Sequence, residues 1–193
     1  MVKRVFFSFH YKDVIDFRVN VVRNHKLTKN NQAGYFDASI WETAKKTSKI
    51  ALKRLINNEL QNTSTTCVLI GSETYERPWV KYEIFRSIYK GNKLLGIHIN
   101  RIRDKYQKTK TLGNNPFDYI GVEFNSDASK FAFTEYKNGS WYYWEEIDST
   151  RFFNNTYFSK SEAGKHLSLS KYFKTYDWIN DDGYNNFDIW LDE

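Results

Sequence analysis

A tryptophan and a glutamate stand four residues apart within Pro78–Tyr89, and their types and spacing carry the clearest chemical potential in the chain. Residues four apart share one face of a helix, so Trp79 and Glu83 would point at the same ligand. An indole offers a flat stacking surface, and a carboxylate stabilises a nearby positive charge. The alternative is that Glu83, on a helix that also carries Lys81 and Arg86, belongs to solvated surface.

Short apolar runs that alternate with amphipathic stretches are expected to position this pair. The apolar runs predict strands over Arg4–His10, Gly34–Asp37, Thr66–Gly71 and Lys93–Ile99. The amphipathic stretches predict helices over Asp13–His25 with Asp13 as its cap, Ser48–Leu60 and Pro78–Tyr89. This alternation indicates an α/β fold with a central parallel sheet and helices on both faces. Ligand sites of such sheets lie beyond the carboxyl ends of the strands, here Ser8–Tyr11, Gly71–Thr74 and His98–Asn100.

A β-hairpin is predicted in the second half of the chain. Lys130–Lys137 and Ser140–Glu146 alternate around Asn138-Gly139, a pair typical of tight hairpin turns. The alternation predicts one buried face, formed by Phe131, Phe133, Trp141 and Tyr143. A hairpin that packs on the body is favoured over one that binds a ligand.

The rest of the chain predicts a C-terminal addition to the α/β core. Arg101–Gly113 is polar and basic and indicates a loop, and Phe117–Phe124 indicates a further strand. Residues 151–193 look irregular and then helical near Ser170–Trp178 and Asp182–Leu191. We therefore expect a core over 1–125 and a hairpin with a C-terminal helical extension over 126–193, packed as one compact domain.

The charge of the 193-residue chain is unevenly distributed. The formal net charge is +6, but residues 174–193 hold one Lys and six Asp or Glu, which leaves 28 basic against 17 acidic residues elsewhere. A basic body suits an anionic small molecule or nucleic acid, although it also fits an ordinary solvated surface. Because the aromatic residues follow core-like patterns, we expect no nucleic-acid partner.

Several kinds of site are excluded by composition. Cys67 is the single cysteine, so it forms neither an internal disulfide nor a cysteine-based zinc site. No glycine-rich phosphate loop occurs, and the four histidines lack metal-binding spacing. No apolar run approaches the roughly 20 residues that cross a bilayer, and the start does not resemble a signal peptide. We expect a cytoplasmic protein without a membrane or metal partner.

Two motifs and several longer segments resemble one known family. Phe7-Ser8-Phe9-His10-Tyr11-x-Asp13 closes the first predicted strand, and Trp79-x-x-x-Glu83 opens a later helix, as in bacterial TIR domains. The segments VFFSFHYKDVIDFRVNVVRNH, TCVLIGSETYERPWVKYEI and YDWINDDGYNNF are similar to the TIR component of the Thoeris anti-phage defence system. The resemblance implies a flavodoxin-like TIR fold.

The resemblance also implies an enzyme of NAD+. Proteins of this family cut the bond between nicotinamide and ribose, and the Thoeris TIR protein makes a cyclic ADP-ribose isomer that activates a separate effector after infection. NAD+ would be the substrate, with no further cofactor. Glu83 matches the catalytic glutamate, and Trp79 belongs to the same motif. The residues that match the nucleotide site are Ser8, Phe9, His10, Tyr11, Asp37 and Trp41.

Two points stay open at this level. Arg77 or Lys81 is expected to offset the pyrophosphate of the substrate, and a helix N-terminus would serve equally well. TIR domains also associate with one another, so the alternative function is a non-catalytic interaction module.

Overall fold

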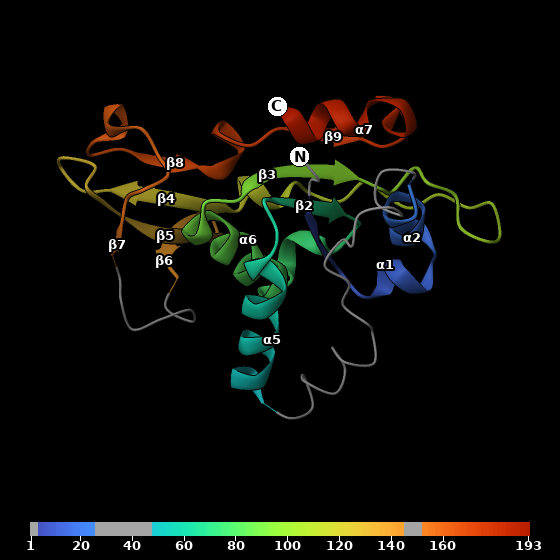
Figure 1. The fold of residues 1–193 in the computed structure, drawn as a ribbon, viewed down its shortest axis with the longest axis horizontal. Helices are drawn as coiled ribbons and strands as arrows, with labels where there is room; N and C mark the ends of the chain where they lie inside the picture. The colour runs from blue at the N-terminus through green and yellow to red at the C-terminus, as the bar shows by residue number, and fades with distance from the viewer. Residues whose placement is uncertain (1–3, 26–47, 145–151) are drawn as a thin grey trace.

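The computed structural model describes residues 4–25, 48–144 and 152–193, which form two adjoining sheets with helices packed against them (Figure 1). The first sheet contains β1 (Val5–Phe9), β2 (Thr65–Ile70), β3 (Lys93–His98) and β9 (Thr175–Asp177). The second contains β4 (Ile120–Phe124), β5 (Lys130–Lys137), β6 (Ser140–Tyr143), β7 (Phe153–Asn154) and β8 (His166–Ser168). The helices are α1 (Lys12–Ile15), α2 (Arg18–Arg23), α5 (Lys49–Gln61), α6 (Pro78–Lys90) and α7 (Gly183–Asp192).

The first sheet is parallel throughout, in the order β1-β2-β3-β9. Every residue of β2 is buried, as a strand covered on both faces requires. Phe6 and Val68 pack with α5 and α6 on one face, and Phe7 and Leu69 pack with α2 and α7 on the other. The predicted α/β architecture is therefore confirmed.

Helix α6, which carries the Trp79/Glu83 motif, begins and ends where its residues favour a boundary. Pro78 occupies the first turn, where its missing N–H breaks no helical hydrogen bond. Gly91 follows the helix with φ of +85°, the left-handed conformation that glycine adopts without strain. In the middle, Ser87 Oγ lies 2.7 Å from Thr66 Oγ1 and fastens the helix to β2.

The helix predicted over Asp13–His25 is broken into α1 and α2. Phe17 lies between them with φ of +65°, a conformation that side-chain-bearing residues rarely adopt. Asp13 is not a cap, because it lies inside α1 and is buried. The break brings Arg18 inward at 1% exposure, where it donates to carbonyl oxygens of the loop that follows β3.

The predicted hairpin is confirmed as β5 and β6, and both turn residues have positive φ, 50° at Asn138 and 82° at Gly139. The prediction that its four rings share one face is wrong. Tyr136 stands opposite Trp141, and Thr134 opposite Tyr143, so these two rings of β6 lie on the face away from Phe131 and Phe133. The two-residue turn sets this register, because it pairs Lys137 with Ser140. The alternation within each strand does not by itself show which residues of the two strands share a face.

The C-terminal segment joins the parallel sheet. The helix predicted over Ser170–Trp178 is wrong, because a 3₁₀ turn and then β9 occupy this stretch, whereas the helix predicted over Asp182–Leu191 is confirmed as α7. Gly96 N donates to Lys174 O and Trp178 N to His98 O, so β9 satisfies the otherwise open edge of β3. Both sheets thus take strands from each side of residue 125.

The strand predicted over Gly34–Asp37 lies outside the described residues. Among the described helices, none combines the length and apolar character needed to cross a membrane.

Candidate active site

A buried hydroxyl and a buried carboxyl group meet where β1 ends. Ser8 Oγ donates a hydrogen bond of 2.5 Å to Glu83 Oε2, and the two residues are 0% and 5% exposed. Side chains alternate along a strand, so Ser8 and Phe6 both point to the face that α6 covers. The pair therefore joins the carboxyl end of the first strand to the helix that carries the Trp79/Glu83 motif.

Burial raises the pKa of Glu83 to about 8, and the hydrogen bond from Ser8 opposes this rise. At neutral pH the carboxyl group is thus mostly protonated in this closed arrangement. A cationic ligand beside Glu83 would favour its carboxylate form, because a nearby positive charge lowers the pKa of an acid. Such a group is suited to stabilise positive charge that develops beside it.

The indole of Trp79 is half-buried one turn before Glu83. Its ring meets Tyr82 edge to face with centroids 5.9 Å apart, and it packs against the core formed with α5 and α6. The sequence prediction that Trp79 and Glu83 lie on one helix, four residues apart, is met by α6.

The residues that follow Ser8 separate onto different sides. Phe9 packs on the opposite face of the sheet, with the Arg23 guanidinium 5.6 Å from its ring centroid. His10 and Tyr11 are partly buried in the loop, and burial together with the charge of Arg77 lowers the pKa of His10 to about 4. The structure thus brings Ser8 into contact with Glu83, whereas Phe9 lies on the other face of the sheet. Asp37 and Trp41 lie outside the described residues.

The two cations predicted to face the substrate's pyrophosphate differ in their surroundings. Lys81 is buried and its Nζ lies 3.1 Å from Glu135 Oε2 of β5, so it joins α6 to the second sheet. Arg77 directly precedes α6 and forms an ion pair with Glu73 at the carboxyl edge. Of the two, Arg77 has the position that a substrate at this edge would require.

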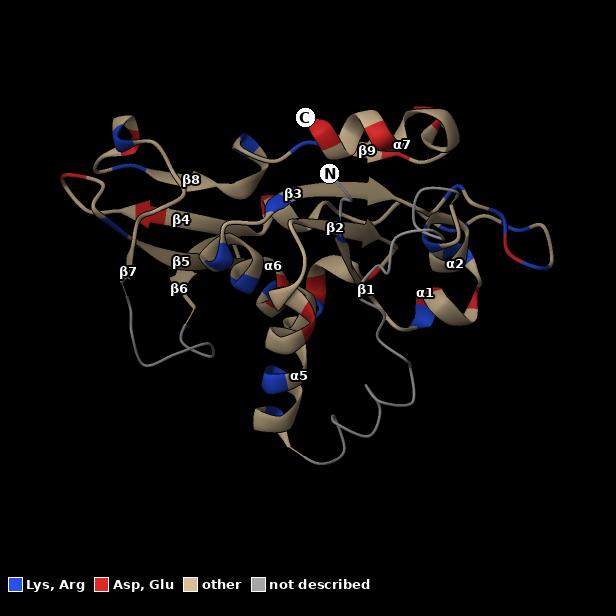
Figure 2. Cartoon of the chain, viewed as in Figure 1, with Lys and Arg blue, Asp and Glu red and all other residues tan. Residues whose placement is uncertain are grey.

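The loop over residues 101–113 covers the exit of β2, which the sequence did not indicate. Ser72 Oγ donates to Thr111 O at 2.8 Å, and Gly113 lies directly on Gly71. Figure 2 shows basic segments along this loop, at the edge of the molecule beside α2. One of these basic residues, Lys110, lies 3.5 Å from Asp13 and also pairs with Asp16.

Gly113→Ala is expected to destabilise the protein by about 1–3 kcal/mol, the usual cost of overpacking. A Cβ at this position would lie 1.9 Å from Gly71 O, a backbone atom that does not yield without moving β2 or the loop. Urea unfolding monitored by tryptophan fluorescence measures the loss. Leu112→Ala is the matched control, because this neighbour is 59% exposed. Equal stability of the two variants would contradict the close packing of loop and strand.

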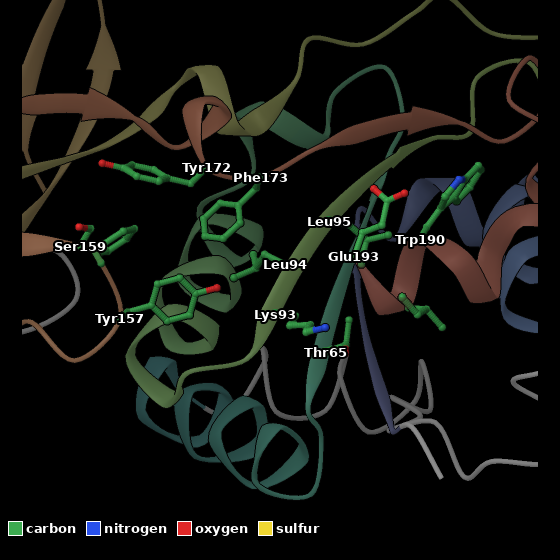
Figure 3. Close-up of a pocket in the computed structure, with 12 residues that line it drawn as sticks. Thr65, Lys93, Leu94, Leu95, Tyr157, Ser159, Tyr172, Phe173, Trp190 and Glu193 are labelled. Carbon is green, nitrogen blue, oxygen red and sulfur yellow. The ribbon is translucent and has the colours of Figure 1, made fainter. Parts of the chain in front are cut away.

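A cavity of about 290 Å³ lies elsewhere, at the amino ends of β2 and β3 (Figure 3). Its lining includes Leu94, Tyr157, Phe173 and Glu193 and none of the predicted site residues. Within the described residues, no group of three or more His, Cys, Asp or Glu is arranged to hold a metal ion. The candidate chemistry therefore stays with the Ser8–Glu83 pair at the opposite end of the sheet.

The order of the parallel strands, the helices on both faces and the carboxyl group at the exit of β1 define an α/β protein of the TIR-like class. Residues 6–104 match the family model described as "Thoeris protein ThsB, TIR-like domain". A protein of Bacillus cereus (strain MSX-D12) named "Putative cyclic ADP-D-ribose synthase ThsB1" is 58% identical over 193 residues, which cover 99% of this chain and 100% of that protein. The chain belongs to the ThsB TIR-like family of Thoeris proteins, as its motifs predicted.

Proposed function

We propose that this protein cleaves NAD+ at the bond between nicotinamide and ribose and forms a cyclic ADP-ribose isomer. The buried Ser8–Glu83 pair at the carboxyl end of β1 is the observation that carries the proposal. The relative named as a cyclic ADP-D-ribose synthase supports it, because the two chains align over their full lengths. The product would act as a diffusible signal in the cytoplasm that activates a partner effector after infection.

One carboxyl group suffices for this bond cleavage. The nicotinamide ring of NAD+ is a pyridinium cation, so it leaves as a neutral molecule with the bonding electron pair and needs no acid. Most glycosidases require two carboxyl groups, one of them to protonate the leaving group. Glu83, once ionised, would stabilise the oxocarbenium charge at the anomeric carbon and hold the ribose hydroxyls, while Ser8 orients the carboxylate.

The fate of that cation decides the product. Attack by water gives ADP-ribose, whereas attack by a nucleophilic atom of the same ADP-ribose, with loss of its proton, gives a cyclic isomer. Exclusion of water favours cyclisation, because the internal nucleophile is held close to the reacting carbon. The loop that closes over β2 through Thr111 and Gly113 supplies such cover.

Mass spectrometry of the reaction products tests the proposal. Purified protein is incubated with NAD+, alone and with extract from phage-infected cells that supplies the infection trigger. The expected result is free nicotinamide together with a product that has the mass of ADP-ribose less one water. Phage protection without any NAD+ conversion would overturn the proposal and favour the non-catalytic interaction module.

A further inference from the structure

Three nitrogen groups face one carboxylate oxygen at the carboxyl edge of the parallel sheet. Lys12 Nζ lies 3.4 Å from Glu73 Oε2, and His10 Nδ1 lies 4.0 Å from the same atom. Arg77 Nη2 forms an ion pair with this oxygen as well. Lys12 begins α1 just after β1, whereas Glu73 and Arg77 lie between β2 and α6, so this carboxylate bridges the start of α1 and the connection after β2.

The cluster has more capacity for negative charge than Glu73 uses. The ammonium group of Lys12 and the guanidinium group of Arg77 share one carboxylate. Arg77 Nε is buried, and among the described residues no acceptor lies within hydrogen-bond distance of it. The side chain of Glu73 is 43% exposed, so solvent and small molecules reach the cluster.

The start of α6 adds to this capacity. Arg77 is the residue that precedes the helix, and its side chain does not cap the first turn. The free N–H groups of a helix N-terminus favour an anion nearby. The starts of α1 and α6 and the connection after β2 thus converge on the carboxylate of Glu73.

The cluster adjoins the proposed reaction site. Arg77 and Glu83 are six residues apart, or about 9 Å along the helix axis. At the end of β1, His10 follows Ser8 by two residues. A dinucleotide that places its ribose at Glu83 would therefore bring its phosphates close to Lys12 and Arg77.

We infer that Lys12, Arg77 and the start of α6 bind the diphosphate of the substrate, and that Glu73 occupies this subsite in the resting protein as an internal anion which the diphosphate displaces. The inference rests on the proposed function and specifies the ligand chemistry of that site. Displacement of Glu73 frees both cations. The side chain of Arg77 is already partly buried at 34% exposure, whereas that of Lys12 is 64% exposed. Glu73 thus weakens substrate binding and limits activity until a diphosphate takes its position.

Binding of ADP-ribose to Glu83→Gln protein tests the inference without turnover. Isothermal titration calorimetry compares this parent with variants that also carry Glu73→Gln or Arg77→Gln. We expect Glu73→Gln to tighten ADP-ribose binding about tenfold, which equals about 1.4 kcal/mol, and Arg77→Gln to weaken it by a similar factor. Adenosine, which lacks phosphate, should bind all three proteins alike.

Glu76→Gln is the matched control. It removes the same charge from an exposed glutamate of the same turn, one that accepts a hydrogen bond from Tyr75 instead. If Glu73→Gln leaves the affinity unchanged, or if Glu76→Gln tightens it equally, the internal-anion role is overturned. Cleavage of NAD+ by the wild-type protein alongside that result would leave the proposed function intact. Because Glu73 is partly exposed, circular dichroism should show folded variants, and Glu73→Ala provides a second test.

Discussion

Glu83→Gln is expected to reduce the conversion of NAD+ by at least about 10²- to 10³-fold while the protein stays folded. The amide has the shape of the carboxyl group but no charge to stabilise an oxocarbenium ion. The hydroxyl of Ser8 still finds an acceptor in the amide oxygen, so the contact between β1 and α6 persists. Nicotinamide release, followed by chromatography, measures the effect.

The same substitution should change how stability depends on pH. The pKa of Glu83 is about 8 in the folded protein against a usual 4.5, so between these values the folded state retains a proton that the unfolded state has lost. The free energy of unfolding therefore falls as the pH rises through this window, by an amount on the order of 5 kcal/mol from this group. Glu83→Gln removes the dependence and should be the more stable protein near pH 8.5.

Urea unfolding at pH 5 and pH 8.5 separates these contributions. Wild-type protein should lose more stability across the interval than Glu83→Gln does, and the difference between the two proteins reports Glu83 alone. Activity should run the opposite way, because the carboxylate is the working form and kcat/KM rises with pH toward about 8. Parallel pH profiles of stability for the two proteins would show that Glu83 is not buried as a protonated acid.

The sequence predicted those elements whose own residues determine them. The apolar run of β2 and the amphipathic pattern of α6, with Pro78 at its start, are local signals, and both elements fold where expected. β9 carries no such signal: its three residues become a strand because β3 offers an open edge. The break at Phe17 likewise depends on partners of Arg18 that lie more than eighty residues away.

The candidate site also combines features that local sequence patterns predict with features that depend on distant residues. The spacing of Trp79 and Glu83 was enough to place both on one helix, and the family resemblance pointed to Ser8. The convergence of Lys12 and Arg77 on Glu73 joins two segments that are about sixty residues apart, so no periodicity within either segment reveals it. The pairing of Lys81 is hidden from the sequence for the same reason, because its partner Glu135 belongs to β5, more than fifty residues along the chain.

Arg18→Met is expected to destabilise the protein by about 3 kcal/mol, although methionine replaces most of the buried volume. The guanidinium donates to Ile102 O at 2.8 Å and to Lys108 O at 2.6 Å, and it also lies within 4 Å of the carboxylates of Asp16 and Asp104. Removal of the guanidinium leaves the two carbonyl oxygens without this donor and Asp104 without this cation, whereas Asp16 keeps its pair with Lys110. Loss of one partner of a buried ion pair costs about 3–5 kcal/mol in the interior and less where solvent enters. Urea unfolding provides the measurement.

Arg103→Met is the appropriate control, since this arginine of the same loop is exposed and its loss should cost no more than about 0.5 kcal/mol. The function should respond as well, because Arg18 holds the loop that covers the exit of β2. A loosened loop admits water to the oxocarbenium ion, so the ratio of ADP-ribose to cyclic product should rise in Arg18→Met under conditions where the variant is folded. An unchanged product ratio with the expected loss of stability would mean that the loop supports the fold but does not exclude water from the reaction.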